Sequence, residues 1–234
     1  MISVIIPTYD NPKELKKSLA SLAKQTYKDL EIIVIDDGSQ ESVDEIIDDF
    51  AKRLSKLHHY RIPHGGANMA RQYGAELASG EYLIFWDSDV VAKPEMLETM
   101  LETLRNNPRA SYAYSRYVYG HKGFKVWPFN EAKLKAMPYI HTTSLIRQKH
   151  FPGWDKDLDR LQDWDLWLTM LEQDHKGIYI PKYLFRIITG GTISAWLPKY
   201  AYRKPFKYLL PKKIKDRIKR YENAVRVIKK KHNL

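Results

Sequence analysis

The sequence contains no cysteine and no apolar run that approaches the roughly 20 residues needed to span a bilayer. The missing thiols exclude disulfides, zinc–thiolate sites and thiol catalysis. Residues 1–7 lack a basic segment followed by a long apolar run, so no signal peptide is expected. We therefore expect a cytoplasmic protein, either free or bound peripherally at the inner face of the cell membrane.

Several motifs that usually accompany alternating strands and helices are also missing. The chain has no Walker loop, no GxGxxG and no Ser-His-Asp grouping, and its histidines show no metal-ligand spacing. These absences argue against an NAD-dependent enzyme and against a P-loop NTPase.

The net charge of +11 is concentrated at one end of the chain. Residues 199–234 contain fourteen Lys/Arg and two acidic residues, a net charge of +12, so the other 198 residues together carry about −1. A nucleic-acid partner is therefore not predicted from the basic pI, because the body of the protein is nearly neutral.

Apolar strands alternate with helical patterns in the first part of the chain. Strands are expected at 2–6, 31–35, 60–62 and 82–86, and helices near 12–22, 43–54, 67–79 and 94–106. This order predicts an α/β fold with a mostly parallel sheet and helices on both faces, in which ligands bind beyond the carboxyl ends of the strands.

The second part is less regular. A strand is expected at 112–119, a helix at 163–173, and two short strands at 178–180 and 183–188. We divide residues 1–195 into a first half, 1–107, and a second half, 108–195.

Acidic residues follow two of the expected buried strands. Asp87-Ser88-Asp89 comes directly after the strand that ends in Trp86, and Asp36-Asp37 follows the second strand. Paired carboxylates at a buried strand end are costly to desolvate unless a cation neutralises them, and Mg²⁺ is held by such carboxylates together with substrate phosphates. A solvated turn is the alternative for each motif.

Three other residues are candidates with ordinary alternatives. Arg71 lies on an expected helix, where it could pair with a diphosphate or simply face solvent. Asp163 and Asp165 begin the helix at 163–173, and either could be a general base or a helix cap.

Five ordered segments together resemble the family 2 glycosyltransferases over about residues 1–195. They are SVIIPTYDNPKELKKSLASLAKQTY, EIIVIDDGSQ, GGANMARQYGAELASGEYLIFWDSDV, SLIRQKHF and LQDWDLWLTMLEQ. The resemblance implies a GT-A fold, a Mg²⁺ or Mn²⁺ cofactor, and an inverting transfer from a nucleoside-diphosphate sugar, with UDP the expected carrier. The implied acceptor is a carbohydrate or a lipid-linked molecule, as in the synthesis of cell-surface polysaccharide or glycolipid.

The same resemblance implies that residues 1–107 form the nucleotide-binding half and residues 108–195 the acceptor half, and it assigns the site. It implies a nucleotide-binding role for Pro7, Thr8, Asp10, Asp36, Asp37, Arg71, Asp87 and Ser88, metal binding for Asp89 with Asp87, and a catalytic base at Asp163. Three motifs depart from the family: ARQ stands where ARN is usual, QD stands where ED is usual, and Gly153-Trp154-Asp155 stands where an FDE-like acceptor segment is usual. The last departure leaves the identity of the acceptor open. Asp165 is the alternative base.

Residues 196–234 form a basic tail. Trp196, Tyr200, Tyr202, Phe206 and Tyr208 are interspersed with Lys and Arg, and Ile214, Ile218, Tyr221, Val225 and Ile228 recur at helical spacing. An amphipathic helix is predicted, which contacts an anionic membrane, packs on the core with its basic face in solvent, or binds nucleic acid.

Two other functions stay open for the whole chain. A non-catalytic nucleotide-sugar-binding protein on a degenerate GT-A fold would explain the altered ARQ and QD motifs, although Asp37, Asp87, Asp89 and Asp163 are all present. A nucleotidyltransferase shares the alternating architecture, but it requires a Gly-rich phosphate loop where this chain has Thr8-Tyr9-Asp10-Asn11-Pro12.

Overall fold

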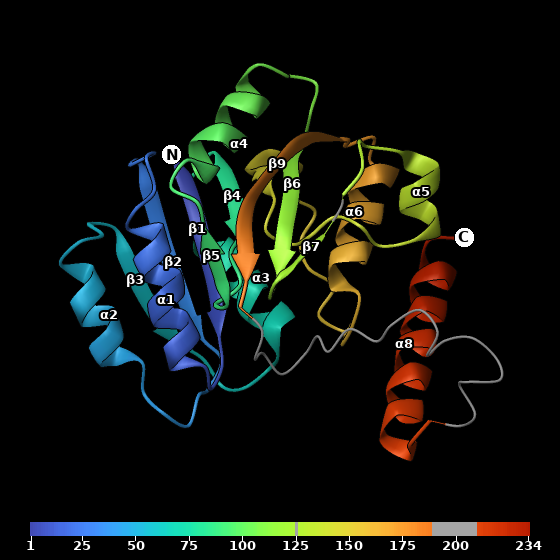
Figure 1. The fold of residues 1–234 in the computed structure, drawn as a ribbon, viewed down its shortest axis with the longest axis horizontal. Helices are drawn as coiled ribbons and strands as arrows, with labels where there is room; N and C mark the ends of the chain where they lie inside the picture. Colours follow the sequence, from blue (N-terminus) through green and yellow to red (C-terminus); the bar gives the residue numbers. More distant parts are fainter. Residues whose placement is uncertain (125, 189–209) are drawn as a thin grey trace.

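Strand β1 (Ile2–Thr8) is buried along its whole length because it lies inside the sheet, between β2 (Leu30–Asp36) and β4 (Tyr82–Phe85). The computed structural model describes residues 1–124, 126–188 and 210–234, which form one curled sheet with helices on both faces (Figure 1). With β3 (Leu57–Arg61) at the edge, these strands form a parallel array in the order β3-β2-β1-β4. The helices between them are α1 (Pro12–Leu22), α2 (Asp44–Ala51) and α3 (Ala67–Leu77).

The second half extends the sheet with mixed pairing. Beyond β4 the order continues β8-β6-β9-β5, where β8 is antiparallel to β4 and to β6, and β6 is parallel to β9. Its strands are β5 (Val90–Ala92), β6 (Tyr112–Tyr119), β7 (Lys122–Phe124), β8 (Leu145–Arg147) and β9 (Gly177–Ile187). Its helices are α4 (Met96–Arg105), α5 (Glu131–Ala136), the short η1 (Gln148–His150) and α6 (Gln162–Glu172).

Alternate residues of β1 supply different layers of the core, as the period of a strand requires. Ile2, Val4 and Ile6 pack in the layer that also holds the apolar faces of α1, α2 and α4. Ile5 packs in the layer on the other side with Trp164 and Trp167 of α6. The predicted α/β architecture with helices on both faces is confirmed.

Three predicted strands differ clearly from the observed ones. The third strand covers Leu57–Arg61 and not 60–62, because an edge strand can carry the polar pair His58-His59. The expected pair of strands at 178–180 and 183–188 is one strand, β9. Its pairing with β6 jumps from Ile180 to Tyr183, so an irregularity in register accommodates Pro181 without ending the strand.

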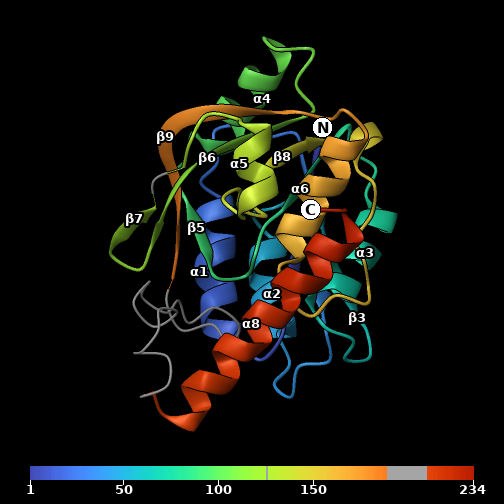
Figure 2. The same ribbon diagram turned by 90° about the vertical axis from the view of Figure 1, so that its right-hand side faces the viewer.

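The predicted amphipathic helix in the tail is α8 (Lys212–Lys231), which runs across one side of the molecule (Figure 2). Ile218 and Ile228 on its predicted apolar stripe are fully buried, and Ile228 packs in the same layer as α6. The boundary at 195/196 and the aromatic residues at 196, 200, 202, 206 and 208 lie outside the described residues.

Candidate active site

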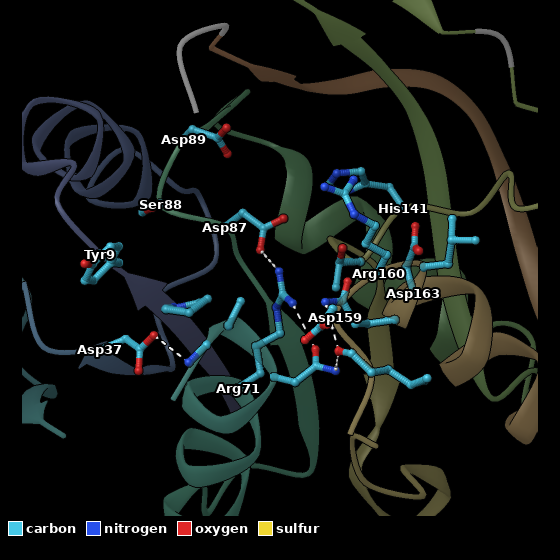
Figure 3. Close-up of a pocket in the computed structure, with 18 of the residues that line it drawn as sticks. Tyr9, Asp37, Arg71, Asp87, Ser88, Asp89, His141, Asp159, Arg160 and Asp163 are labelled. Atoms are coloured by element: carbon cyan, nitrogen blue, oxygen red, sulfur yellow. Dashed lines mark hydrogen bonds and ion pairs between the residues drawn. The ribbon is translucent and has the colours of Figure 1, made fainter. Parts of the chain in front are cut away.

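A cavity of about 770 Å³ opens at the carboxyl ends of the parallel strands. It is bordered by the ends of β1, β2 and β4, by the start of α3, by β6 and β7, by the loop that leads into α6, and by α8. Figure 3 shows Asp37 and Tyr9 on one side, Asp163, Arg160 and His141 on the other, and Asp87 with Arg71 between them. The volume suits a ligand of the size of a nucleotide-sugar.

Asp87-Ser88-Asp89 forms the turn after β4 and lines this cavity. Arg71 Nη2 donates to Asp87 Oδ1 at 2.6 Å. Burial alone would raise the pKa of Asp87, but the Arg71 guanidinium outweighs it and the pKa is lowered. Burial and the charge of Asp87 raise the pKa of Asp89 to about 7, so the two neighbouring carboxyls have opposite proton preferences.

A chain of side-chain hydrogen bonds connects the end of β1 to this turn. Thr8 Oγ1 donates to Asn11 Oδ1 at 2.6 Å, and Asn11 Nδ2 donates to Ser88 Oγ at 2.6 Å. Asn11 occupies the N-cap position of α1, but its side chain makes no capping bond to the helix. Its amide instead fixes the position of Ser88 relative to Thr8.

Asp37 is buried at the end of β2, and both of its carboxylate oxygens accept backbone hydrogen bonds. Gly65 N donates to Oδ1 at 2.8 Å and Gly66 N donates to Oδ2 at 2.9 Å. Gly66 has φ +89, in the left-handed region that favours glycine, and it directly precedes α3. Asp37 thus holds the loop that forms one wall of the cavity, and the ring of His64 stacks on Tyr9 at the same wall.

Asp10 and Asp36 do not line the cavity, unlike the other predicted nucleotide-site residues Pro7, Thr8, Asp37, Arg71, Asp87 and Ser88. Asp10 Oδ1 accepts from Gln40 N at 2.7 Å, and Asp36 Oδ1 accepts from Ser39 N at 2.9 Å. Both carboxylates shape the loop after β2. Direct contact of either with a nucleotide stays a prediction.

The altered ARQ motif has a structural role in this chain. Gln72 Oε1 accepts a hydrogen bond from Trp154 N at 2.9 Å, and the Arg71 guanidinium lies over the Trp154 ring, 5.2 Å from its centroid. Gln72 therefore connects α3 to the loop before α6, and Trp154 of this loop packs its ring against the guanidinium of Arg71.

Asp163 lies in the first turn of α6 and lines the cavity. Burial raises the pKa of its carboxyl to about 6, although Trp164 N donates to Oδ1 at 2.9 Å and opposes the shift. Leu161 immediately before the helix has φ +58, a left-handed conformation that is uncommon for leucine. Asp163 therefore lines the cavity with a carboxyl whose pKa is about 6.

Asp165, the alternative base, is engaged elsewhere. Its carboxylate accepts from His232 Nε2 at 2.8 Å and from Lys231 Nζ at 2.9 Å, both at the end of α8, and it does not line the cavity. His232 Nδ1 also lies 2.8 Å from Glu172, and Lys231 bonds Asp155. These contacts fasten α8 to α6 and give Asp165 a structural role away from the cavity.

Replacing Asp165 with Asn is expected to lower the free energy of unfolding by about 3 kcal/mol, because it removes the buried carboxylate that binds the Lys231 ammonium and a ring nitrogen of His232. Urea unfolding measures the change. Asp216→Asn on the exposed face of α8 is the control. A loss below about 0.5 kcal/mol for Asp165→Asn, equal to that of the control, would show that the contact does not stabilise the fold.

His141 lines the cavity and had no signal in the sequence. Its Nδ1 accepts from Thr143 N at 3.0 Å, so the neutral ring carries its proton on Nε2. Burial lowers the pKa of His141 to about 4, which keeps the ring neutral at ordinary pH. The histidine therefore offers the cavity a neutral N–H donor beside Asp163.

Solved structures with similar folds include two of S. aureus TarS. The structure in complex with UDP matches with TM-score 0.70 and 20% identity, over 81% of this chain and 60% of that chain. A mannosyltransferase from Pyrobaculum calidifontis in complex with GDP-Man and Mn²⁺ matches with TM-score 0.65 and 18% identity, over 81% of this chain and 57% of that chain. These likenesses define the GT-A class of fold.

The family model "Glycosyl transferase family 2" matches residues 3–162, and the chain belongs to this family. An uncharacterised glycosyltransferase of Methanocaldococcus jannaschii is 29% identical over 80% of this chain and 70% of its own length. The glycosyltransferase GlyG of Streptococcus pneumoniae is 38% identical over 45% of this chain and 35% of its own. A glucosyl-dolichyl phosphate glucuronosyltransferase of Haloferax volcanii is 32% identical over 47% of this chain and 36% of its own. The chain thus spans little more than a third of the length of the last two proteins.

In the part of the chain that the structure describes, no helix combines the length and the apolar character that crossing a membrane requires. The contacts of α8 with α6 agree with the prediction that the helix packs on the core. They do not test contact of its basic face with a membrane.

Proposed function

We propose that the protein transfers a sugar from a nucleoside-diphosphate sugar, most simply a UDP-sugar, to an acceptor hydroxyl with inversion at the anomeric carbon. The observation that carries the proposal is one cavity that contains both the Asp87-Ser88-Asp89 turn and Asp163. A family 2 glycosyltransferase needs these two functions together: a site for the charged leaving group and a base for the acceptor.

The donor would lie across the strand ends, with its nucleoside between Tyr9 and the Gly65-Gly66 loop and its diphosphate near Asp87 and Arg71. The similar TarS structures in complex with UDP and UDP-GlcNAc support a uridine-diphosphate sugar as the donor. The mannosyltransferase in complex with GDP-Man makes a guanosine-diphosphate sugar the alternative donor to test. The acceptor is proposed to be a carbohydrate or a lipid-linked molecule of cell-surface polysaccharide or glycolipid.

A divalent cation fits the turn. The carboxylates of Asp87 and Asp89 line the same cavity. Burial, together with repulsion from Asp87, raises the pKa of Asp89, and a bound cation would offset both effects. No group of three His, Cys, Asp or Glu side chains within residues 1–124, 126–188 and 210–234 forms a complete site. Asp89 with Asp87 would therefore hold Mg²⁺ or Mn²⁺ together with substrate phosphates and water, and the cation would stabilise the charge of the leaving diphosphate.

The chain's own residues would act as follows. Asp163 in its ionised form accepts the proton of the acceptor hydroxyl while the oxygen of that hydroxyl bonds to the anomeric carbon. The bond from that carbon to the diphosphate oxygen breaks on the opposite face, so the configuration inverts. Arg71 holds Asp87 ionised, and the N–H of His141 is available to orient a substrate hydroxyl.

The proposal is tested by supplying the protein with Mn²⁺ and a set of UDP-, GDP- and dTDP-sugars and measuring release of the nucleoside diphosphate without acceptor. Slow release from one donor, abolished by EDTA, is the expected result. Binding of nucleotide without release from any donor in the presence of an extract containing acceptors would instead indicate a non-catalytic binding protein.

The activity is expected to fall as the pH drops below about 6, because only the ionised form of Asp163 accepts a proton and burial sets its pKa to about 6. The logarithm of kcat/KM should rise with unit slope up to this pH and then level off. A profile that is flat between about pH 5 and about pH 8 would contradict the role of Asp163.

A further inference from the structure

Arg160 is a cation that lines the cavity. It is half-buried, it lines the cavity, and it makes no hydrogen bond or ion pair with any residue that the structure describes. Figure 3 places it beside Asp163 and His141, across the cavity from Tyr9 and Asp37. A guanidinium presents a planar set of donors that matches the oxygens of a phosphate or a carboxylate.

The loop that carries Arg160 is held in place from three directions. Asn68 Nδ2 donates to Asp155 O at 2.8 Å and to Leu158 O at 3.3 Å. Gln72 binds Trp154 N, and Lys231 of α8 binds the Asp155 carboxylate. These contacts fix the backbone on both sides of Lys156, the second cation of the loop that lines the cavity.

The position of Arg160 decides which substrate it would contact. The donor side of the cavity has its own arginine, Arg71, which is already paired with Asp87 at 2.6 Å. Arg160 lies three residues before Asp163, on the side where the acceptor hydroxyl must approach the base. Lys156 lies in the same loop and Arg217 of α8 also lines the cavity, so cationic side chains from two elements border it.

We infer that Arg160, with Lys156, forms an oxyanion-binding site for the acceptor, and that the acceptor carries a phosphate or a carboxylate near the hydroxyl that is glycosylated. This inference rests on the proposed function, because it assigns the Asp163 side of the cavity to the acceptor. It extends that function by naming the charge of the acceptor and the residues that select it.

The test is a calorimetric titration of small anionic probes into the protein saturated with UDP and Mn²⁺, which occupy the donor side. Glucose 6-phosphate and glucuronate are the phosphate and carboxylate probes, and glucose is the neutral probe. At least one anionic probe should bind about tenfold more tightly than glucose. Arg160→Gln should remove this preference, Arg160→Lys should retain part of it, and Arg109→Gln, an exposed arginine outside the cavity, should leave it unchanged.

The inference would be overturned if neither anionic probe bound better than glucose. It would also be overturned if Arg160→Gln weakened UDP binding about tenfold while the anionic probes were unaffected, since Arg160 would then serve the donor. Thermal melting of each variant confirms that it is folded. If UDP does not bind, the proposed function is refuted. The anionic probes are then titrated into the protein without UDP, and their affinities relative to glucose decide the inference separately.

Discussion

Replacing Asp163 with Asn should lower kcat for sugar transfer by about 10³-fold and leave the affinity for UDP within about twofold. Asn retains the size of the side chain and can still accept from Trp164 N, but it cannot take up the proton of the acceptor hydroxyl. Transfer to the acceptor measures the first quantity, and titration of UDP measures the second.

Asp159→Asn is the matched control for this variant. Asp159 also lines the cavity, four residues earlier, but it is exposed and belongs to the loop before α6. Its replacement should reduce kcat by less than about threefold. If Asp163→Asn turned over at a rate close to that of the unmodified protein, another group would have to be the base.

Replacing Asp89 with Asn should remove the dependence of UDP binding on Mn²⁺ and lower transfer by about 10²–10³-fold, because one of two carboxylates that would hold the cation is lost. The same change removes the repulsion between Asp89 and Asp87, so the variant should be at least as stable as the unmodified protein in the absence of metal. Loss of activity without loss of stability is the pattern that separates a ligand from a structural residue.

Glu14→Gln is the control for Asp89→Asn. Glu14 on α1 raises the pKa of Asp89 through its charge, yet it does not line the cavity. This variant should keep metal-dependent UDP binding. If UDP binding to Asp89→Asn still required Mn²⁺, as it should for Glu14→Gln, residue 89 would not be a ligand of the cation.

Much of the fold could be predicted because its signals are local. The runs expected as strands at 2–6, 31–35 and 82–86 are largely apolar, and each precedes a polar turn, which is typical of a buried parallel strand with its carboxyl end at the ligand edge. The convergence of Asp37 and Asp87 at one cavity follows from this order, whereas the place of Asp163 was implied only by the family resemblance. The sequence pattern predicts edge strand β3 at 60–62 and not at its observed position, Leu57–Arg61, because the polar residues of this strand give no periodic signal.

The parts of the site that could not be predicted depend on long-range contacts. Asp10 and Asp36 follow strands as Asp37 and Asp87 do, and only the folded loop shows that their carboxylates face backbone amides outside the cavity. His141 packs against the rings of Tyr117 and Phe185, which are distant from it in sequence. The ion pairs of Asp165 join residues 66 and 67 positions apart, which no local pattern reports.

We propose above all that the cavity binds a nucleoside diphosphate with a divalent cation. A thermal-shift screen of UDP, GDP and their sugars, with and without Mn²⁺, tests this binding most directly. A ligand present at about 100 times its Kd stabilises the native state by about 2.7 kcal/mol. For a chain of this length we therefore expect one nucleotide to raise Tm by about 5–10 °C with Mn²⁺ and by much less without it. No rise with any nucleotide, with or without Mn²⁺, would contradict the claim.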